Sequence, residues 1–339
     1  MTAYLAAILA GLGAGSVYSL MGLGLVVTAR GSGLVNFAYG TICAWSAYVY
    51  YDLRENARYP IFLPGPWSAH RFGGDEVRVT VASAVLITLA TSAVISSLVY
   101  VLIFRALRTA PLLARIVASV GVLLFLQGMI SIRFEGTSSI NLPSLLPGGL
   151  LHMTDELVVD IDAIWLIAIA ASMAVGSWLL FRFSRTGLAI RAAAESEKGA
   201  TLLGFASDRL AVVTWIMASV IASVVGILAA PLFQLSPLLF TQLMVPALGA
   251  ALVGRFTSFG WTVGAGLAIG AVQSVAPALQ ADFSWLPRFG LRDGLVFGTI
   301  IIAMFAVGRR LPERGALDLG RAAEVGSGRI RTEIGRAHV

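Results

Sequence analysis

Charge, histidine and cysteine are all scarce in this 339-residue chain. Charged residues make up 12% of it, there are three histidines, and Cys43 is the one cysteine. A single cysteine excludes an internal disulfide framework, and a thiol inside an apolar segment behaves as a small apolar side chain. His70, His152 and His338 stand far apart with no ligand spacing around them. We therefore expect no metal site and no catalytic residues of the histidine-dependent kind.

Short motifs for nucleotide binding and for catalysis are also absent. The sequence has no GxxxxGK[ST], GxSxG or HExxH, and GLGAGS at 11–16 lacks the GxGxxG spacing of a dinucleotide site. We expect no enzyme and no cofactor, so any ATP that drives this protein must be bound by partner subunits. The net charge of +6 comes with arginines scattered over several loops, which is not a nucleic-acid footprint.

Apolar residues dominate instead, at 58% of the chain with a mean hydropathy of +0.85. Met1–Ala29 and Val79–Phe104 carry no charge, and each exceeds the ~20 residues that a spanning helix needs. Backbone groups in lipid must be paired within their own segment, which favours helices. The prediction is an all-α, polytopic helical membrane protein with about eight or nine transmembrane or partly re-entrant helices. The expected spans are 4–29, 34–51, 80–104, 116–132, 163–181, 210–232, 239–254, 259–279 and 294–308.

The basic residues predict an orientation. With the N-terminus outside, seventeen of the 24 Lys and Arg residues fall on the inner side. The other seven are Arg54, Arg58, Arg71, Arg78, Arg133, Arg288 and Arg292. The excess of Lys and Arg marks the cytoplasmic side, so the 184–209 loop and the C-terminus are expected there. Residues 1–310 form the membrane domain, and 311–339 are expected to be a polar, disordered tail or linker.

Small and amide side chains inside the spans give two sets of candidates. The glycines Gly11, Gly15, Gly260, Gly264, Gly266 and Gly270 are expected to let helices pack closely, or to form a pathway seam between two subunits. The amides of Asn36, Gln127, Gln242 and Gln273 either bind a polar solute or make interhelical packing bonds. Ionisable groups are almost missing from the predicted spans, which disfavours an ion-coupled carrier.

The 184–209 loop is charged and rich in alanine, and it carries the one lysine, Lys198. A helix is expected from Arg191 to Leu203, ended by Gly204, with Ser207 capping the next span. Leu202 and Leu203 would give that helix an apolar face.

Three segments then resemble the branched-chain amino-acid ABC transporter permeases, the LivH-like family. They are RTGLAIRAAAESEKGATLLGF at 185–205, GLVNFAYGTICAWSAY at 33–48 and ALVGRFTSFGWTVGAGLAIGAVQS at 251–274. The resemblance covers about residues 11–310. Departures are Tyr39 in place of the family's usual histidine, Arg255-Phe256-Thr257 in place of a small turn, and a long 52–78 loop.

The resemblance implies a permease subunit of an ATP-binding-cassette importer in the bacterial inner membrane. Its solute would be a branched-chain amino acid or a related small polar molecule. The implied partners are a second permease subunit, two P-loop ATPase subunits and an extracytoplasmic solute-binding protein. The implied coupling residues are Arg191, Ala193, Glu195, Leu202, Leu203 and Gly204, and Tyr39 joins the four amides as a candidate for the solute pathway.

Two alternatives stay open. The chain could instead be an autonomous channel or secondary carrier for a small neutral, urea- or amide-like solute. Residues 333–339, EIGRAHV, resemble the translated read-through of a sequencing adapter, which would make them an artefact. A continuation of the natural product past Thr332, into a second permease half, is therefore left open, as are the solute and the pairing of permease halves.

Overall fold

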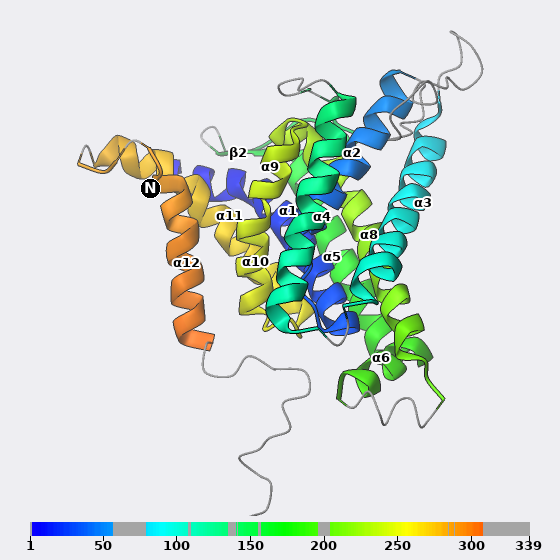
Figure 1. Cartoon of the computed structure of the whole chain (residues 1–339). Coiled ribbons are helices and arrows are strands. Elements are labelled where there is room, and N and C mark those ends of the chain that lie inside the picture. The colour runs from blue at the N-terminus through cyan, green and yellow to red at the C-terminus, as the bar shows by residue number, and fades with distance from the viewer. Residues whose placement is uncertain are drawn as a thin grey trace, which may run out of the picture.

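The computed structural model describes residues 2–56, 79–107, 110–134, 140, 142–154, 157–195, 204–283, 285–287 and 289–307. The predicted tail at 311–339 lies outside these residues. Most of the described chain is helical, and its two strands form one short antiparallel hairpin (Figure 1). In chain order the elements are α1 (Thr2–Ser32), α2 (Tyr39–Glu55), α3 (Val81–Val99), the π-helical turn η2 (Tyr100–Phe104), α4 (Leu112–Arg133), β1 (Leu150–Thr154), β2 (Leu157–Asp160), α5 (Ile161–Phe183), α6 (Arg185–Glu195), α8 (Ser207–Phe233), α9 (Pro237–Gln242), α10 (Met244–Val253), α11 (Phe259–Asp282) and α12 (Leu291–Val307).

The helical membrane fold predicted from the sequence is confirmed. Within the described residues, six helices are long and apolar enough to cross a bilayer, namely those at 4–32, 81–104, 112–133, 161–183, 208–233 and 259–282. The predicted spans at 34–51, 239–254 and 294–308 correspond to α2, to the pair α9–α10, and to α12. Large apolar side chains such as Leu102, Phe125 and Phe305 are exposed on the outer helices, as expected for surfaces that face lipid.

The hairpin was not predicted. Leu150 pairs with Asp160 and Leu151 with Val159, so the chain turns back on itself just before α5 begins. Its strands are too short to give an alternation that stands out against the apolar background.

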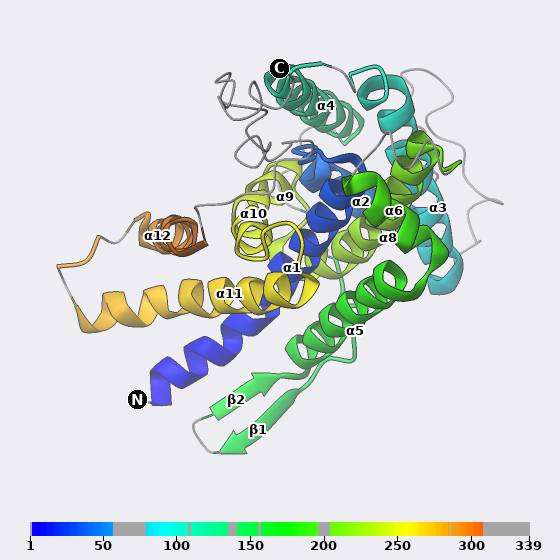
Figure 2. The same ribbon diagram turned by 90° about the horizontal axis from the view of Figure 1, so that it is seen from below.

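Helix α1 runs through the middle of the bundle, between α11 on one side and α5 and α8 on the other (Figure 2). Its closest neighbour is α11, and glycines on both helices make that approach possible. A Cβ on Gly11 would lie 2.5 Å from the carbonyl oxygen of Gly270, and one on Gly15 would lie 2.8 Å from the Cα of Leu267. Without side chains at the crossing, the two backbones come into direct contact.

Hydroxyl groups join α2, α3 and α8 on the other side of α1. Ser92 Oγ donates to the carbonyl of Ser219 at 3.3 Å, and Ser96 Oγ donates to that of Trp215 at 3.2 Å. Ser223 Oγ donates to Ser46 Oγ at 3.4 Å. Such bonds hold helices together where lipid offers no hydrophobic driving force between them.

The bundle has two distinguishable ends. Arg105 Nε lies 3.1 Å from Asp208 Oδ2, which places the end of η2 beside the start of α8. The Arg30 guanidinium covers the rings of Phe181 and Phe259, which places the ends of α1 and α5 beside the start of α11. Helix α6 lies at this same end (Figure 1), which we call the α6 end. The hairpin and the last residues of α2 and α4 lie at the opposite end.

The helix in the 184–209 loop, called the linker from here on, differs from its prediction. Helix α6 begins at Arg185, six residues before the predicted start, and is described to Glu195, while 196–203 lie outside the described residues. The N-cap of α8 is Ala206 and not Ser207, and it makes no side-chain capping bond. The prediction placed a helix in this loop but set its start too late. The helix begins directly after Ser184, because the Oγ of Ser184 accepts from the backbone N–H of Gly187 at 2.9 Å.

Candidate functional site

A break between α1 and α2 is the feature that most suggests a transport pathway. Residues 34–36 are not helical, and Gly33 adopts φ +69°, where only glycine is relaxed. Asn36 then organises the start of α2: its Oδ1 accepts from the N–H of Ala38 at 3.0 Å, and its carbonyl accepts from the N–H of Tyr39 at 3.2 Å. Asn36 is 1% exposed, and its Nδ2 has no hydrogen-bond partner among the described residues.

Tyr39 fixes the depth of this break. Its hydroxyl donates to the carbonyl of Ala218 at 3.0 Å, near the middle of α8. The ring lies directly against Gly24 of α1, where any Cβ would collide with it. Helix α2 therefore begins partway across the bundle, inside the apolar thickness. Non-helical backbone at such a depth is found where protein or a polar cavity, and not lipid, surrounds it.

A second interrupted span lies beside the break. The N–H of Gly40 points at Met244 Sδ at 3.2 Å, and a Cβ on Gly40 would come within 2.7 Å of the carbonyl oxygen of Phe240. Phe240 belongs to α9 and Met244 opens α10, so the start of α2 packs on the joint between these helices. Thr41 Oγ1 is buried here with no partner among the described residues. Paired helix breaks at mid-depth are typical of solute sites in transporters.

The predicted pathway residues do not form one group. Gln273 of α11 is buried, and its Oε1 accepts from the Tyr18 hydroxyl of α1 at 2.5 Å, which is an interhelical packing bond. Gln127 is half-exposed on α4, and Gln242 is exposed on α9. Asn36 and Tyr39 alone stand at the break, and the assignment of all five to a solute pathway stays a prediction.

The predicted packing glycines divide into two groups. Gly11, Gly15, Gly266 and Gly270 all lie at the crossing of α1 and α11. Gly260 and Gly264 are exposed on the other face of α11, and a Cβ at either would meet nothing within 4 Å. The GxxxG spacing could not show which residues on the helix face a neighbour.

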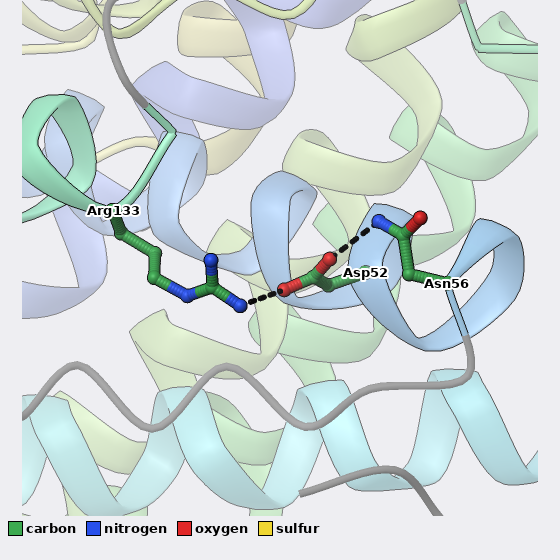
Figure 3. A network of polar contacts seen from close by, with 3 residues as sticks. All are labelled: Asp52, Asn56 and Arg133. Carbon is green, nitrogen blue, oxygen red and sulfur yellow. Dashed lines mark hydrogen bonds and ion pairs between the residues drawn. The ribbon is translucent and has the colours of Figure 1, made fainter. Parts of the chain in front are cut away.

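The sequence missed a buried ion pair. Asp52 was predicted to lie in the outer loop, but α2 continues to Glu55 and buries Asp52 to 2% exposure. Arg133, the last residue of α4, contacts Asp52 Oδ2 through Nη2 at 3.4 Å, and Asn56 Nδ2 donates to Asp52 Oδ1 at 2.6 Å (Figure 3). The four-residue spacing of Asp52 and Asn56 was the signal in the sequence that the helix continues past Asp52, since this spacing places both side chains on one helix face.

The linker residues predicted for coupling are only partly described. Ala193 is buried and Arg191 is half-buried, and Arg191 Nη2 donates to the carbonyl of Arg182 at 3.3 Å. Glu195 is the last described residue of α6, and Leu202 and Leu203 lie outside the described residues. Gly204 has φ +84°, the left-handed conformation expected of it.

These features define a class: a polytopic helical membrane protein built around a central glycine-rich helix, with two interrupted helices meeting inside the bundle. Comparison with known proteins gives the family. The sequence profile of the family described as branched-chain amino acid transport system / permease component matches residues 7–307, and the chain belongs to this family. It is therefore a permease component of a transport system and not a catalyst.

Individual relatives are distant but cover most of the chain. The branched-chain amino acid permease proteins LivH of Salmonella typhimurium and of Escherichia coli K12 are 25% and 24% identical, each over 284 residues that make up 82% of this chain and 87% of the relative. The permease protein BraD of Pseudomonas aeruginosa is 24% identical over 307 residues, 89% of this chain and 93% of the relative. No solved structure gives a significant match.

Proposed function

We propose that the chain is the permease subunit of an ATP-driven importer that moves branched-chain amino acids, or a related small polar solute, into the cell. The observation that carries this proposal is the family match over residues 7–307, together with relatives whose names specify high-affinity branched-chain amino acid transport. The chain has no P-loop sequence, so ATP would be bound and hydrolysed by partner subunits.

The partners would be a second permease subunit, two P-loop ATPases and an extracytoplasmic solute-binding protein, in a bacterial inner membrane. We place the ATPase contact on the 184–209 linker. Helix α6 protrudes from the bundle at the α6 end (Figure 1), yet it is joined firmly to α5. A Cβ on Gly187 would lie 2.6 Å from the Cα of Phe181, so the two helices touch through backbone. A push on α6 would therefore move α5 as well.

The solute would pass near the start of α2. Asn36 carries a buried amide N–H₂ group without a partner, and Thr41 adds a buried hydroxyl that also lacks one among the described residues. Both groups are neutral, and a neutral hydrogen bond contributes only about 0.5–1.5 kcal/mol net. Bonds of this strength suit a pathway, because the solute must leave as readily as it enters.

A secondary carrier or channel for a small neutral solute is the second candidate. The buried Asp52 favours it, because an ionisable group inside a membrane bundle often takes part in ion coupling. Its partner Arg133 and its place at the last turn of α2 favour a structural ion pair instead.

Reconstitution separates the two candidates. We expect the purified chain alone in liposomes to accumulate neither leucine nor urea against a gradient. With the second permease, both ATPases, the binding protein and ATP, leucine uptake should appear and should survive proton and sodium ionophores. Accumulation by the isolated chain under an ion gradient would decide for the carrier, and ATP-driven uptake of a sugar alone would keep the mechanism and reject the solute.

Two variants at Gly204 test the linker within the same assay. Proline fixes φ near −65° and cannot adopt the +84° of this position, whereas asparagine tolerates left-handed backbone. Gly204→Pro should abolish ATP-driven uptake, and Gly204→Asn should retain it, with equal amounts of both proteins in the membrane. Equal uptake by the two variants would reject the linker as the coupling element.

A further inference from the structure

The α6 end contains a cavity whose lining includes none of the residues at the break between α1 and α2. It has a volume of about 490 Å³ and lies between α1, α5, α6 and the start of α11. Three arginines line it, one each from α1, α5 and α6: Arg30, Arg182 and Arg191. No acidic residue is among the described residues that line it. Three cations in one hollow create a local positive potential that attracts an anion.

Two of the arginines, Arg30 and Arg191, are held in place by the fold. The Arg30 guanidinium lies 5.3 Å from the ring centroid of Phe181 and 5.0 Å from that of Phe259, so two aromatic faces orient it. Arg191 and Arg30 line the same cavity, so their like charges repel each other. The Nε of Arg191 is buried and has no partner among the described residues. An anion seated between them would relieve this repulsion and accept the unused N–H.

Apolar side chains at and beside the cavity are exposed. Val175 and Trp178 of α5 are 55% and 48% exposed, and Trp261, next to the lining residue Gly260, is 70% exposed. These residues belong to helices long enough to cross a bilayer. The cavity therefore opens toward the apolar flank of the bundle, and exposed tryptophans are typical of a membrane interface.

From this combination we propose that the cavity binds the headgroup of an acidic phospholipid, with its phosphate among the three guanidinium groups and its acyl chains along the exposed faces of α5 and α11. Arginine matches the planar, bidentate geometry of phosphate oxygens, and basic pockets between membrane helices select anionic lipids. The lipid would hold α1, α5, α6 and α11 together at the end where α6 joins the bundle.

Native mass spectrometry of the detergent-purified full chain tests the proposal. The probes are phosphatidylglycerol and phosphatidylcholine with the same acyl chains, and inorganic phosphate as a competitor. We expect phosphatidylglycerol to bind in preference to phosphatidylcholine, and Arg182→Gln and Arg191→Gln each to weaken its binding about fivefold. Arg185→Gln is the matched control, because Arg185 lies on α6 as Arg191 does, is exposed and does not line the cavity. It should leave binding unchanged.

A second pair of variants removes no charge. A side chain at Gly260 meets nothing within 4 Å, so Gly260→Leu should fill the cavity mouth without strain and weaken phosphatidylglycerol binding. Gly264→Leu, one turn further along the same exposed face and outside the cavity lining, should not. Equal binding of the two lipids, or unaltered binding in Gly260→Leu and both arginine variants, would overturn the proposal. Displacement of the lipid by an equal concentration of phosphate would show a site for free anions and would also overturn it.

Discussion

A few polar side chains determine how this apolar chain is arranged internally. Asn36 starts a helix inside the bundle, Tyr39 ties that helix to α8, and Asp52 ties its other end to α4 through Arg133. A polar group buried without a hydrogen-bond partner costs several kcal/mol of free energy, on the order of its transfer from water to an alkane. Each of these bonds therefore stabilises the packed bundle. These polar residues therefore fix the depth and the direction of α2.

We predict that Asp52→Ala destabilises the protein by about 3 kcal/mol, because it leaves the largely buried Arg133 guanidinium without its carboxylate. The measurement is thermal unfolding in detergent. Glu55→Ala is the control, since Glu55 is a carboxylate on the same helix and is exposed. The same loss of stability in both variants would mean that the ion pair contributes nothing specific.

For Asn36 we predict a transport defect without a folding defect in Asn36→Ser. A serine hydroxyl can accept the N–H of Ala38 in the same kind of turn, so the start of α2 should persist, while the unpartnered Nδ2 is removed. In the ATP-driven uptake assay the KM for the solute should rise several-fold at an unchanged protein level. Wild-type kinetics would exclude the Asn36 amide from the solute pathway.

At the scale of elements, the crossing of α1 and α11 is the central contact of the bundle. It depends on which face of each helix carries the glycines, and that face was not evident from their spacing. Gly266 and Gly270 contact α1, while a Cβ at Gly260 or Gly264 on the same helix would meet nothing within 4 Å among the described residues. The same residue type thus has opposite tolerance to substitution within one helix.

Gly270→Leu should therefore destabilise the bundle by about 1–3 kcal/mol or more, because its side chain would collide with the backbone of Gly15 and Gly11. Gly264→Leu should fold normally, since its side chain extends into open space. Size-exclusion profiles and melting temperatures in detergent provide the comparison. Similar stability of the two variants would contradict the crossing as described.

For the whole molecule, the basic residues separate between the two ends. Arg30, Arg105 and Arg191 lie at the α6 end, and Arg54 and Arg133 at the opposite end. This division agrees with the arrangement of loops from which the orientation was predicted. The side of the membrane that each end faces stays a prediction, with the N-terminus outside and the C-terminus cytoplasmic.

Cysteine labelling in intact cells tests that orientation. In a Cys43→Ala background, Glu55→Cys should react with a membrane-impermeant thiol reagent from outside, and Arg185→Cys should react only after permeabilisation. Both positions are exposed, whereas Cys43 is buried, so the wild-type chain serves as the unlabelled control. Labelling of Arg185→Cys but not Glu55→Cys in intact cells would invert the topology.

The sequence by itself determined the class of fold, the approximate segments and the family. Apolar runs of bilayer length have one structural solution, the helix, and the NFAYG and 185–205 motifs are local strings that need no structure to be recognised. The boundaries of the helices were predicted less accurately from the sequence. The early start of α6 and the extension of α2 through Asp52 both depend on caps and partners supplied by neighbouring residues.

Only the tertiary structure decided which residues meet. Asp52 and Arg133 are 81 residues apart, and Tyr18 and Gln273 are 255 apart. The arginines of the proposed lipid site come from three helices. No periodicity within a single segment encodes such pairs, because each helix can rotate about its axis and shift along it without changing its own pattern. The contacts between backbones at glycine and the few buried hydrogen bonds fix that rotation and shift, and they exist only once the helices have packed.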